Sequence, residues 1–233
     1  MKILTIGDIH GRDNWKNILN KNKDLNKIIF TGDYVDSFTK PNVEILSNLK
    51  DIINFKKEYD TDVILLIGNH DCQYLIGYGY PEYGCNGFRP EMLPDLQQLF
   101  YENRELFQFS YQLDNYLWTH AGISSKWYKT RFKEVFEDFD TNTLSEALNY
   151  TFDNKLECIF DVGYKRGGRK PTGGPLWADM YELIHNGMPL KDYNQIVGHN
   201  PVKYIRQERF GVNRSIVFTD CLEYNDTGYI LNI

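Results

Sequence analysis

The chain has 233 residues, of which 42% are hydrophobic and 25% are charged, as is common for globular proteins with a sizeable core. This composition excludes a fibrous or wholly disordered chain, and apolar runs such as Val63–Ile67 are too short to cross a bilayer. The net charge of −6 argues against strong non-specific binding to nucleic acid, although it is compatible with a local basic groove.

The N-terminus and the cysteines predict a cytoplasmic protein without a membrane partner. Met1–Leu4 runs directly into a predicted strand and has neither the apolar length nor the cleavage site of a signal peptide. The four cysteines are scattered and include no Cys-x-x-Cys pair, which favours free thiols in a reducing compartment. A disulfide between Cys72 and Cys85, which flank one loop, is the alternative.

Strands and helices alternate in the N-terminal half. Short apolar strands are predicted at Lys2–Ile6, Lys27–Phe30 and Val63–Ile67, with helices between them at Asp13–Asn20 and Asn42–Lys57. This order predicts an α/β fold in which parallel strands are joined by right-handed crossovers.

The second half of the chain is less regular. We expect one domain over 1–233, with inserted loops at about 74–94 and 162–175, both rich in glycine. The other predicted elements are a helix at Asp95–Glu105, a hairpin of Phe107–Tyr111 with Asn115–Thr119, mostly helical structure over Ser124–Tyr150, and strands at Gln195–Val197, Val202–Glu208, Ser215–Phe218 and Gly228–Asn232.

Five predicted strands end in turns that carry carboxylate, amide or imidazole side chains. The turns are Gly7-Asp8-Ile9-His10, Gly32-Asp33, Gly68-Asn69-His70-Asp71, His120-Ala121-Gly122 and Gly198-His199. Because the carboxyl ends of parallel strands lie along one edge of a sheet, these side chains are expected to meet there. They are hard or borderline metal ligands without a thiolate, which disfavours a structural zinc–cysteine site.

The spacing of these residues suggests two metal ions. Asp8 and His10, two residues apart, could chelate one ion, and Asp33 could bridge to a second ion. The six expected ligands are Asp8, His10, Asp33, Asn69, His120 and His199. Two cations about 3.5–4 Å apart are the usual arrangement for in-line displacement at phosphorus, because they bind phosphoryl oxygens and activate a bridging water as hydroxide.

His70 is expected to act as a general acid rather than as a ligand. Asp36 lies three residues after Asp33 and could accept a hydrogen bond from one nitrogen of the His70 ring. That contact would raise the pKa of His70 and favour the imidazolium form. The other ring nitrogen could then protonate the leaving group, a contribution of about 10²–10⁴ in rate.

The same turns resemble, in order, the signature blocks of calcineurin-like metallophosphoesterases. The blocks read GDIHG from position 7, GDYVD from 32, GNHD from 68, HAG from 120 and GHNP from 198. They are most similar to the phosphoprotein-phosphatase branch and its bacterial and phage relatives, and Leu176–Asp179 resembles a further motif of that branch. The resemblance implies a four-layer α/β/β/α sandwich and the ligand roles given above. It also implies a dinuclear centre, with Mn²⁺ as the expected metal and Fe or Zn²⁺ as alternatives.

Two departures from the family pattern bear on the substrate. Ser37 and Phe38 follow Asp36, where that branch usually has Arg-Gly, so one phosphate-binding arginine is missing from its expected place. The last block lacks the second histidine of many phosphodiesterase relatives. Arg166, in the basic loop, is the expected replacement for binding phosphate, because guanidinium binds phosphate in a bidentate fork, and Arg12 is the second candidate.

Aromatic residues are concentrated in the first inserted loop. They are Tyr74, Tyr78, Tyr80, Tyr83 and Phe88. They could stack on a nucleobase or phenyl ring of the substrate, or they could pack on the protein's own sheet.

We interpret the chain as an enzyme, a metal-dependent hydrolase whose hydroxide attacks a phosphomonoester in line, without a phospho-enzyme. Its expected partner is a phosphorylated substrate: a phosphoprotein, a small phosphomonoester or a nucleotide. One alternative is a diadenosine-tetraphosphatase-like or other nucleotide phosphohydrolase. Another, of a different class, is a non-catalytic binding module on the same fold.

Overall fold

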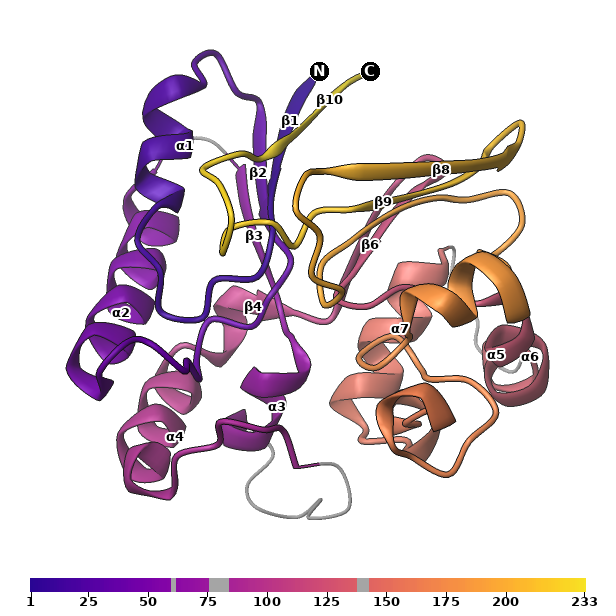
Figure 1. The fold of residues 1–233 in the computed structure, drawn as a ribbon, viewed down its shortest axis with the longest axis horizontal. Helices are drawn as coiled ribbons and strands as arrows, with labels where there is room; N and C mark the ends of the chain where they lie inside the picture. Colours follow the sequence, from indigo (N-terminus) through magenta and orange to yellow (C-terminus); the bar gives the residue numbers. More distant parts are fainter. Residues whose placement is uncertain (60–61, 76–83, 138–142) are drawn as a thin grey trace.

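Two five-stranded sheets form the centre of the computed structural model, which describes residues 1–59, 62–75, 84–137 and 143–233 (Figure 1). The first sheet has the order β10 (Tyr229–Asn232), β1 (Lys2–Ile6), β2 (Lys27–Phe30), β3 (Asp62–Leu66) and β4 (Phe107–Gln108). The second has the order β5 (Ser110–Leu113), β6 (Tyr116–Thr119), β7 (Asn194–Val197), β9 (Arg214–Phe218) and β8 (Arg206–Gly211).

Helices cover the outer faces of the two sheets. Figure 1 shows α1 and α2 on the outer side of the first sheet, and α5, α6 and α7 on the side of the second. The α-helices are α1 (Trp15–Lys21), α2 (Asn42–Glu58), α3 (Asn69–Leu75), α4 (Leu93–Glu102), α5 (Ser125–Trp127), α6 (Lys133–Glu137) and α7 (Leu144–Asp153). Short 3-10 or π turns lie at Pro90–Met92, Arg104–Leu106, Tyr128–Phe132, Glu157–Phe160, Tyr164–Arg166 and Glu182–Asn186. The predicted α/β/β/α sandwich is therefore confirmed.

The layers follow from the alternation of side chains along each strand. Successive residues of a strand point to opposite faces. In the first sheet, Leu4, Ile28 and Phe30 pack with the residues of the helices, whereas Ile3 and Ile29 belong to a separate cluster between the sheets. Because both faces of these strands are apolar, the strands read as continuous hydrophobic runs in the sequence.

The cluster between the sheets draws on both of them. Ile64 and Leu66 of β3 meet Trp118 of β6 and Ile196 of β7, and all four are buried. The indole Nε1 of Trp118 donates a hydrogen bond of 3.0 Å to the hydroxyl of Thr5 on β1. This contact gives the buried indole N–H a partner and joins the two sheets close to the strand ends.

The parallel part of the sandwich was predicted, and one hairpin was placed wrongly. Strands β1, β2, β3 and β4 are parallel neighbours. The expected strand at Phe107–Tyr111 is in fact two strands, β4 and β5, in different sheets. The chain changes sheet at Phe109, where the backbone N–H groups of Phe109 and Ser110 donate to Asn149 Oδ1 at 2.8 and 3.0 Å. A side chain from α7 thus replaces the ladder bonds at the crossing.

The inserted loops and one C-terminal strand also differ from expectation. Tyr74 belongs to α3, and Pro90–Pro94 is helical, so the first loop is shorter than predicted. The basic loop contains a 3-10 turn and a bridge from Gly163 to Lys170. The strand expected at Val202–Glu208 is β8, which begins four residues later. Across the described part of the chain, no helix combines the length and apolar character needed to span a membrane.

Candidate metal centre

The turns that were predicted to carry metal ligands all follow parallel strands. Strands β1, β2 and β3 are parallel in the first sheet, and β6, β7 and β9 are parallel in the second. Asp8, Asp33 and Asn69 follow the first three, and His120 and His199 follow β6 and β7. The carboxyl ends of two sheets therefore bring side chains from distant parts of the chain to one place.

Four residues of these turns have a left-handed backbone conformation that residues other than glycine rarely adopt. The φ angles are 46° at His10, 51° at Asp33, 55° at Asp36 and 62° at His199. Asp and His tolerate this region better than most residues, but it still carries strain. Such strain is maintained where the surrounding contacts fix the turn. His10, Asp33 and His199 belong to groups of candidate metal ligands, and Asp36 contacts His70 beside them.

Two glycines allow the chain to approach the carboxylates closely. A Cβ atom at Gly68 would lie 2.1 Å from Oδ1 of Asp33, and one at Gly198 would lie 2.0 Å from Oδ1 of Asp8. Real side-chain atoms cannot approach that closely, so any other residue at these positions would displace the carboxylates. The glycines of the sequence blocks are therefore needed for space at the site.

Hydrogen bonds orient His10 so that one ring nitrogen points to Asp33. Its Nδ1 lies 3.1 Å from the carbonyl oxygen of Val35 and 3.0 Å from that of Asp36. Because carbonyl oxygens only accept, Nδ1 carries the proton, and the neutral ring has its lone pair on Nε2. That nitrogen lies 3.7 Å from Asp33 Oδ2, on the side of the cluster.

A second group of acceptors meets around His120. Its Nδ1 lies 2.8 Å from the carbonyl oxygen of Thr31, which leaves Nε2 as the lone-pair atom of a neutral ring. Nε2 lies 2.7 Å from Asn69 Oδ1, 3.4 Å from Asp33 Oδ2 and 3.2 Å from Nδ1 of His199. Acceptors that crowd in this way need a shared proton or a cation between them, and the donor set of imidazoles, amide and carboxylate suits a divalent metal.

Asp33 belongs to both groups. Its carboxylate lies within 4.8 Å of ligand atoms of His10 and His70 in one group, and of His120 and His199 in the other. Burial would raise the pKa of Asp33, but the positive charge that the His120 and His70 rings carry when protonated outweighs burial and holds the pKa of Asp33 well below its usual range. The carboxylate is therefore ionised and available to two positive charges at once.

Asp8 lies beside these groups but is in neither of them. Its carboxylate accepts the backbone N–H of His199 at 2.9 and 3.0 Å and the hydroxyl of Thr31 at 3.3 Å. Asp220, which follows β9, is a further buried carboxyl at this edge. Burial and the Asp220 charge raise the pKa of Asp8, and burial and Asp33 raise that of Asp220 to about 7. A cation beside these two carboxyls would stabilise their ionised forms.

The sequence reasoning did not identify Asp220, although the signal was present. Thr219-Asp220 follows a predicted strand in the same way as Gly32-Asp33 and Gly198-His199. The predicted ligand turns all contain glycine or histidine, and Thr219-Asp220 contains neither. Strand β9 is parallel to β7, so its carboxyl end lies at the same edge as His199.

His70 and Asp36 form the pair that was expected. Nδ1 of His70 lies 2.8 Å from Asp36 Oδ2, and the hydroxyl of Tyr74 donates to the other Asp36 oxygen at 2.6 Å. Burial alone would lower the pKa of His70, but the Asp33 and Asp36 carboxylates outweigh it, so the pKa is raised. The ring of His70 also meets that of His10 edge-on, with centroids 5.0 Å apart.

Asp71 holds the turns together and was not assigned a role from the sequence. It is fully buried, and its two carboxylate oxygens accept three backbone N–H groups. The donors are Asp33 at 2.7 Å, Tyr34 at 2.8 Å and Gly68 at 2.9 Å. Asp71 therefore ties the β2 turn to the β3 turn and fixes the backbone on both sides of the Asp33 carboxylate.

Replacing Asp71 with Ala is expected to lower the free energy of unfolding by more than about 3 kcal/mol, because each of three buried N–H groups loses its acceptor at about 1–3 kcal/mol. Urea unfolding in EDTA measures this loss. Asp95→Ala is the matched control, because Asp95 is also third in its helix but is exposed. A loss at Asp71 no larger than that at Asp95 would contradict the structural role.

A match to a known protein family covers all of these candidate ligands. The model of the family described as calcineurin-like phosphoesterase matches residues 1–226. The chain belongs to the calcineurin-like phosphoesterase family. It is therefore a metal-dependent phosphoester hydrolase, as the sequence blocks predicted, and its substrates are phosphorylated compounds. Members of this family generally use two divalent metal ions.

Known structures share the fold of this phosphoesterase. The cold-active protein-tyrosine phosphatase of a psychrophilic Shewanella species is 16% identical, with a TM-score of 0.62 over 99% of this chain and 80% of that chain. A mutant of a cold-active protein tyrosine phosphatase is 17% identical, with a TM-score of 0.61 over 99% and 80%. At these identities the likeness concerns the fold alone. Among curated proteins, none matches the sequence.

The two candidate phosphate-binding arginines of the phosphoesterase have different surroundings. Arg166 forms an ion pair of 3.0 Å with Asp179 and donates to Asn200 Oδ1 at 2.5 Å. Asn200 directly follows His199, so these contacts hold the guanidinium next to the cluster. The Arg12 guanidinium lies 4.0 Å from the exposed carboxylate of Glu223.

Another arginine supports the segment where the family usually has Arg-Gly. Arg89 donates to the backbone carbonyls of Ser37 and Lys40 and to the side chain of Asn42. Its guanidinium therefore holds a turn rather than phosphate. Phe38, in that turn, is 83% exposed, and its ring lies beside Gly87. An exposed aromatic ring thus stands close in sequence to the buried Asp36.

The first inserted loop is described only in part. Phe88 packs on Tyr74 with ring centroids 5.3 Å apart, which agrees with packing on the protein itself. Tyr78, Tyr80 and Tyr83, which were considered for substrate stacking, lie outside the described residues.

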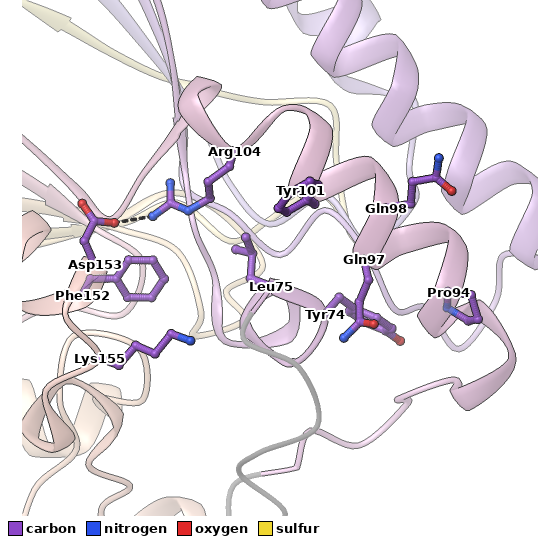
Figure 2. Close-up of a pocket in the computed structure, with 10 residues that line it drawn as sticks. All are labelled: Tyr74, Leu75, Pro94, Gln97, Gln98, Tyr101, Arg104, Phe152, Asp153 and Lys155. Atoms are coloured by element: carbon purple, nitrogen blue, oxygen red, sulfur yellow. Dashed lines mark hydrogen bonds and ion pairs between the residues drawn. The ribbon is translucent and has the colours of Figure 1, made fainter.

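Tyr74 also lines a groove of about 680 Å³ (Figure 2). Its lining includes Leu75, Gln97, Phe152 and Lys155, and Figure 2 shows an ion pair of Arg104 with Asp153 at one end. None of the candidate metal ligands lines this groove. Among the described residues, Tyr74 lines this groove and also donates a hydrogen bond to Asp36, and no other residue of the groove forms a hydrogen bond with the side chains of the His70–Asp36 pair.

Proposed function

We propose that this phosphoesterase hydrolyses phosphomonoesters at a centre of two divalent metal ions, with Mn²⁺ as the physiological metal. The observation that carries the proposal is the position of Asp33, whose carboxylate lies in both groups of candidate ligands. Oδ2 of Asp33 faces both sets of imidazoles, 3.7 Å from His10 Nε2 and 3.4 Å from His120 Nε2, while Oδ1 accepts the backbone N–H of His70 at 2.9 Å. Asp33 would therefore help to hold both ions of a two-metal centre.

The donor set fits such a centre. The residues that would hold the ions are Asp8, His10, Asp33, Asn69, His120 and His199. Their oxygen and imidazole nitrogen atoms suit Mn²⁺, Fe or Zn²⁺, and all four cysteines of the chain are free and buried. When bound, two ions would neutralise phosphoryl oxygens and lower the pKa of a water molecule that attacks phosphorus in line.

The protein's own residues supply a proton and orient the substrate. His70, with its raised pKa and its Asp36 partner, would donate from the other ring nitrogen to the leaving oxygen. Arg166 would bind a phosphoryl oxygen, since Asp179 and Asn200 hold its guanidinium beside His199. No side chain in this arrangement acts as a nucleophile, so we propose direct hydrolysis without a phospho-enzyme.

Two features favour a monoester over a diester or a dinucleoside polyphosphate. The last sequence block has Asn200 where many phosphodiesterase relatives carry a second histidine. Oδ1 of Asn200 accepts hydrogen bonds from the Arg166 guanidinium and from the Met180 backbone N–H. The solved structures of similar fold include a protein-tyrosine phosphatase. An aryl phosphate is therefore our first choice of substrate, either small or on a protein. The free thiols agree with a cytoplasmic enzyme.

Rates on three substrates test the proposal. Purified protein with Mn²⁺ is expected to hydrolyse p-nitrophenyl phosphate at least about tenfold faster, in kcat/KM, than bis-p-nitrophenyl phosphate or diadenosine tetraphosphate. EDTA should remove the activity, and Mn²⁺ should restore it. Preference for diadenosine tetraphosphate would establish the nucleotide alternative, and absence of turnover on all three would favour the non-catalytic binding module.

A further inference from the structure

The side-chain amide of Asn69 has different contacts at its oxygen and at its nitrogen. Oδ1 lies 2.7 Å from His120 Nε2 and 2.8 Å from His199 Nδ1, on the side of the cluster. Nδ2, on the other side, donates a hydrogen bond to the thiol sulfur of Cys85 at 3.0 Å. Asn69 and Cys85 are both buried, so water does not compete for this N–H.

Helix α3 holds both ends of this contact. Asn69 is its first residue, and Gln73 follows four residues later, so the two side chains lie on the same face of the helix. The Gln73 side-chain oxygen accepts the backbone N–H of Cys85 at 2.9 Å. One helix face thus binds Cys85 twice, through its backbone and through its thiol, and this fixes the sulfur relative to the amide.

We infer that Cys85 is a positioning residue for the metal centre, and this inference rests on the proposed metal-dependent function. By accepting from Nδ2, the thiol favours the amide orientation in which Oδ1 faces the ions. Without an acceptor, that orientation leaves a buried N–H unpaired, which is unfavourable. Partners behind a ligand commonly change metal affinity about 10–100-fold when they are removed. The sulfur itself belongs to neither group of candidate ligands.

Substitution of Cys85 separates the hydrogen bond from the volume of the side chain. Cys85→Ala removes the acceptor, whereas Cys85→Ser keeps one in a side chain of similar shape. Cys158→Ala is the matched control, because Cys158 is 7% exposed, close to the 8% of Cys85, and lies in the 3-10 turn Glu157–Phe160. Asn69→Ala shows how much binding is lost when the ligand itself is removed.

The main readout is direct Mn²⁺ binding, followed by the EPR signal of free Mn²⁺. We expect Cys85→Ala to weaken binding of one ion about tenfold or more, Cys85→Ser to stay within about threefold of the unsubstituted protein, and Cys158→Ala to have no effect. At saturating Mn²⁺, kcat of Cys85→Ala should recover to within about twofold of the unsubstituted enzyme. A purely structural defect would not recover in this way.

Failure of the inference can be told from failure of the proposed function. Asn69→Ala is expected to bind Mn²⁺ more weakly than the unsubstituted protein. If it does so but Cys85→Ala binds Mn²⁺ as tightly as the unsubstituted protein, the positioning role is overturned and the metal centre stands. Equal weakening in Cys85→Ala and Cys85→Ser also overturns it, because the acceptor then does not matter. If the unsubstituted protein binds no Mn²⁺, the proposed function fails, and the inference fails with it.

A second variant carries the test if Cys85→Ala does not fold, as judged by thermal unfolding in EDTA. Gln73→Leu removes the side-chain oxygen that holds the Cys85 backbone but leaves the thiol in the chain. Weaker Mn²⁺ binding by a folded Gln73→Leu variant supports the inference, and unchanged binding overturns it.

Discussion

Replacing Asp33 with Asn should lower kcat for p-nitrophenyl phosphate by about 10³-fold or more, because several kcal/mol of charge stabilisation depend on the metal ions that this carboxylate holds. The amide keeps the size of the side chain and tolerates the left-handed backbone at this position, where φ is 51°. It loses the negative charge that lies between the two groups of imidazoles. Metal content by mass spectrometry should fall together with activity.

Asp24→Asn is the control for the Asp33 substitution. Asp24 also has a left-handed backbone, with φ of 56°, but it is exposed. The control should keep its full activity and metal content. If Asp33→Asn retained both ions and more than about a tenth of the activity, the shared role of this carboxylate would be refuted.

Replacing His70 with Asn is expected to lower kcat about 10²–10⁴-fold on alkyl phosphates, whose leaving groups need a proton, and much less on p-nitrophenyl phosphate. The reason is that p-nitrophenolate is a good leaving group without protonation. Asp36→Asn should show the same dependence on the leaving group, because Asp36 holds His70 Nδ1 at 2.8 Å. Rates across a series of aryl and alkyl phosphates measure this dependence.

Metal content distinguishes the acid from a ligand at this position, because His70 also lies close to His10 and Asp33. An acid can be removed without loss of metal, so His70→Asn should keep both ions. Loss of one ion, with equal rate losses on good and poor leaving groups, would make His70 a ligand. His185→Asn is the control, since His185 is exposed in the turn Glu182–Asn186.

The fold could be predicted because its signals are local. Apolar runs such as Lys27–Phe30 and Val63–Ile67 are buried on both faces, so each run stands out as a strand in a parallel sheet. The change of sheet at Phe109 could not be predicted in this way. It depends on the side chain of Asn149, which is forty residues away in the sequence.

The candidate site was predictable as far as residue type and strand order determine it. A ligand at the end of each parallel strand follows from the topology, and the structure brings His10, Asp33, Asn69, His120 and His199 together. The support behind them was not predictable. Nothing in the sequence indicates that Cys85 accepts a hydrogen bond from Asn69. The sequence places Asp71 in a motif but does not show that its carboxylate accepts three backbone N–H groups.

Diffraction from crystals grown with Mn²⁺, measured at the manganese absorption edge, tests the central claim most directly. We expect two anomalous peaks about 3.5–4 Å apart, with the Asp33 carboxylate between them. One peak should also contact His10 and Asp8, and the other should contact Asn69, His120 and His199. A single peak, or peaks that do not touch Asp33, would contradict the two-metal account of this enzyme.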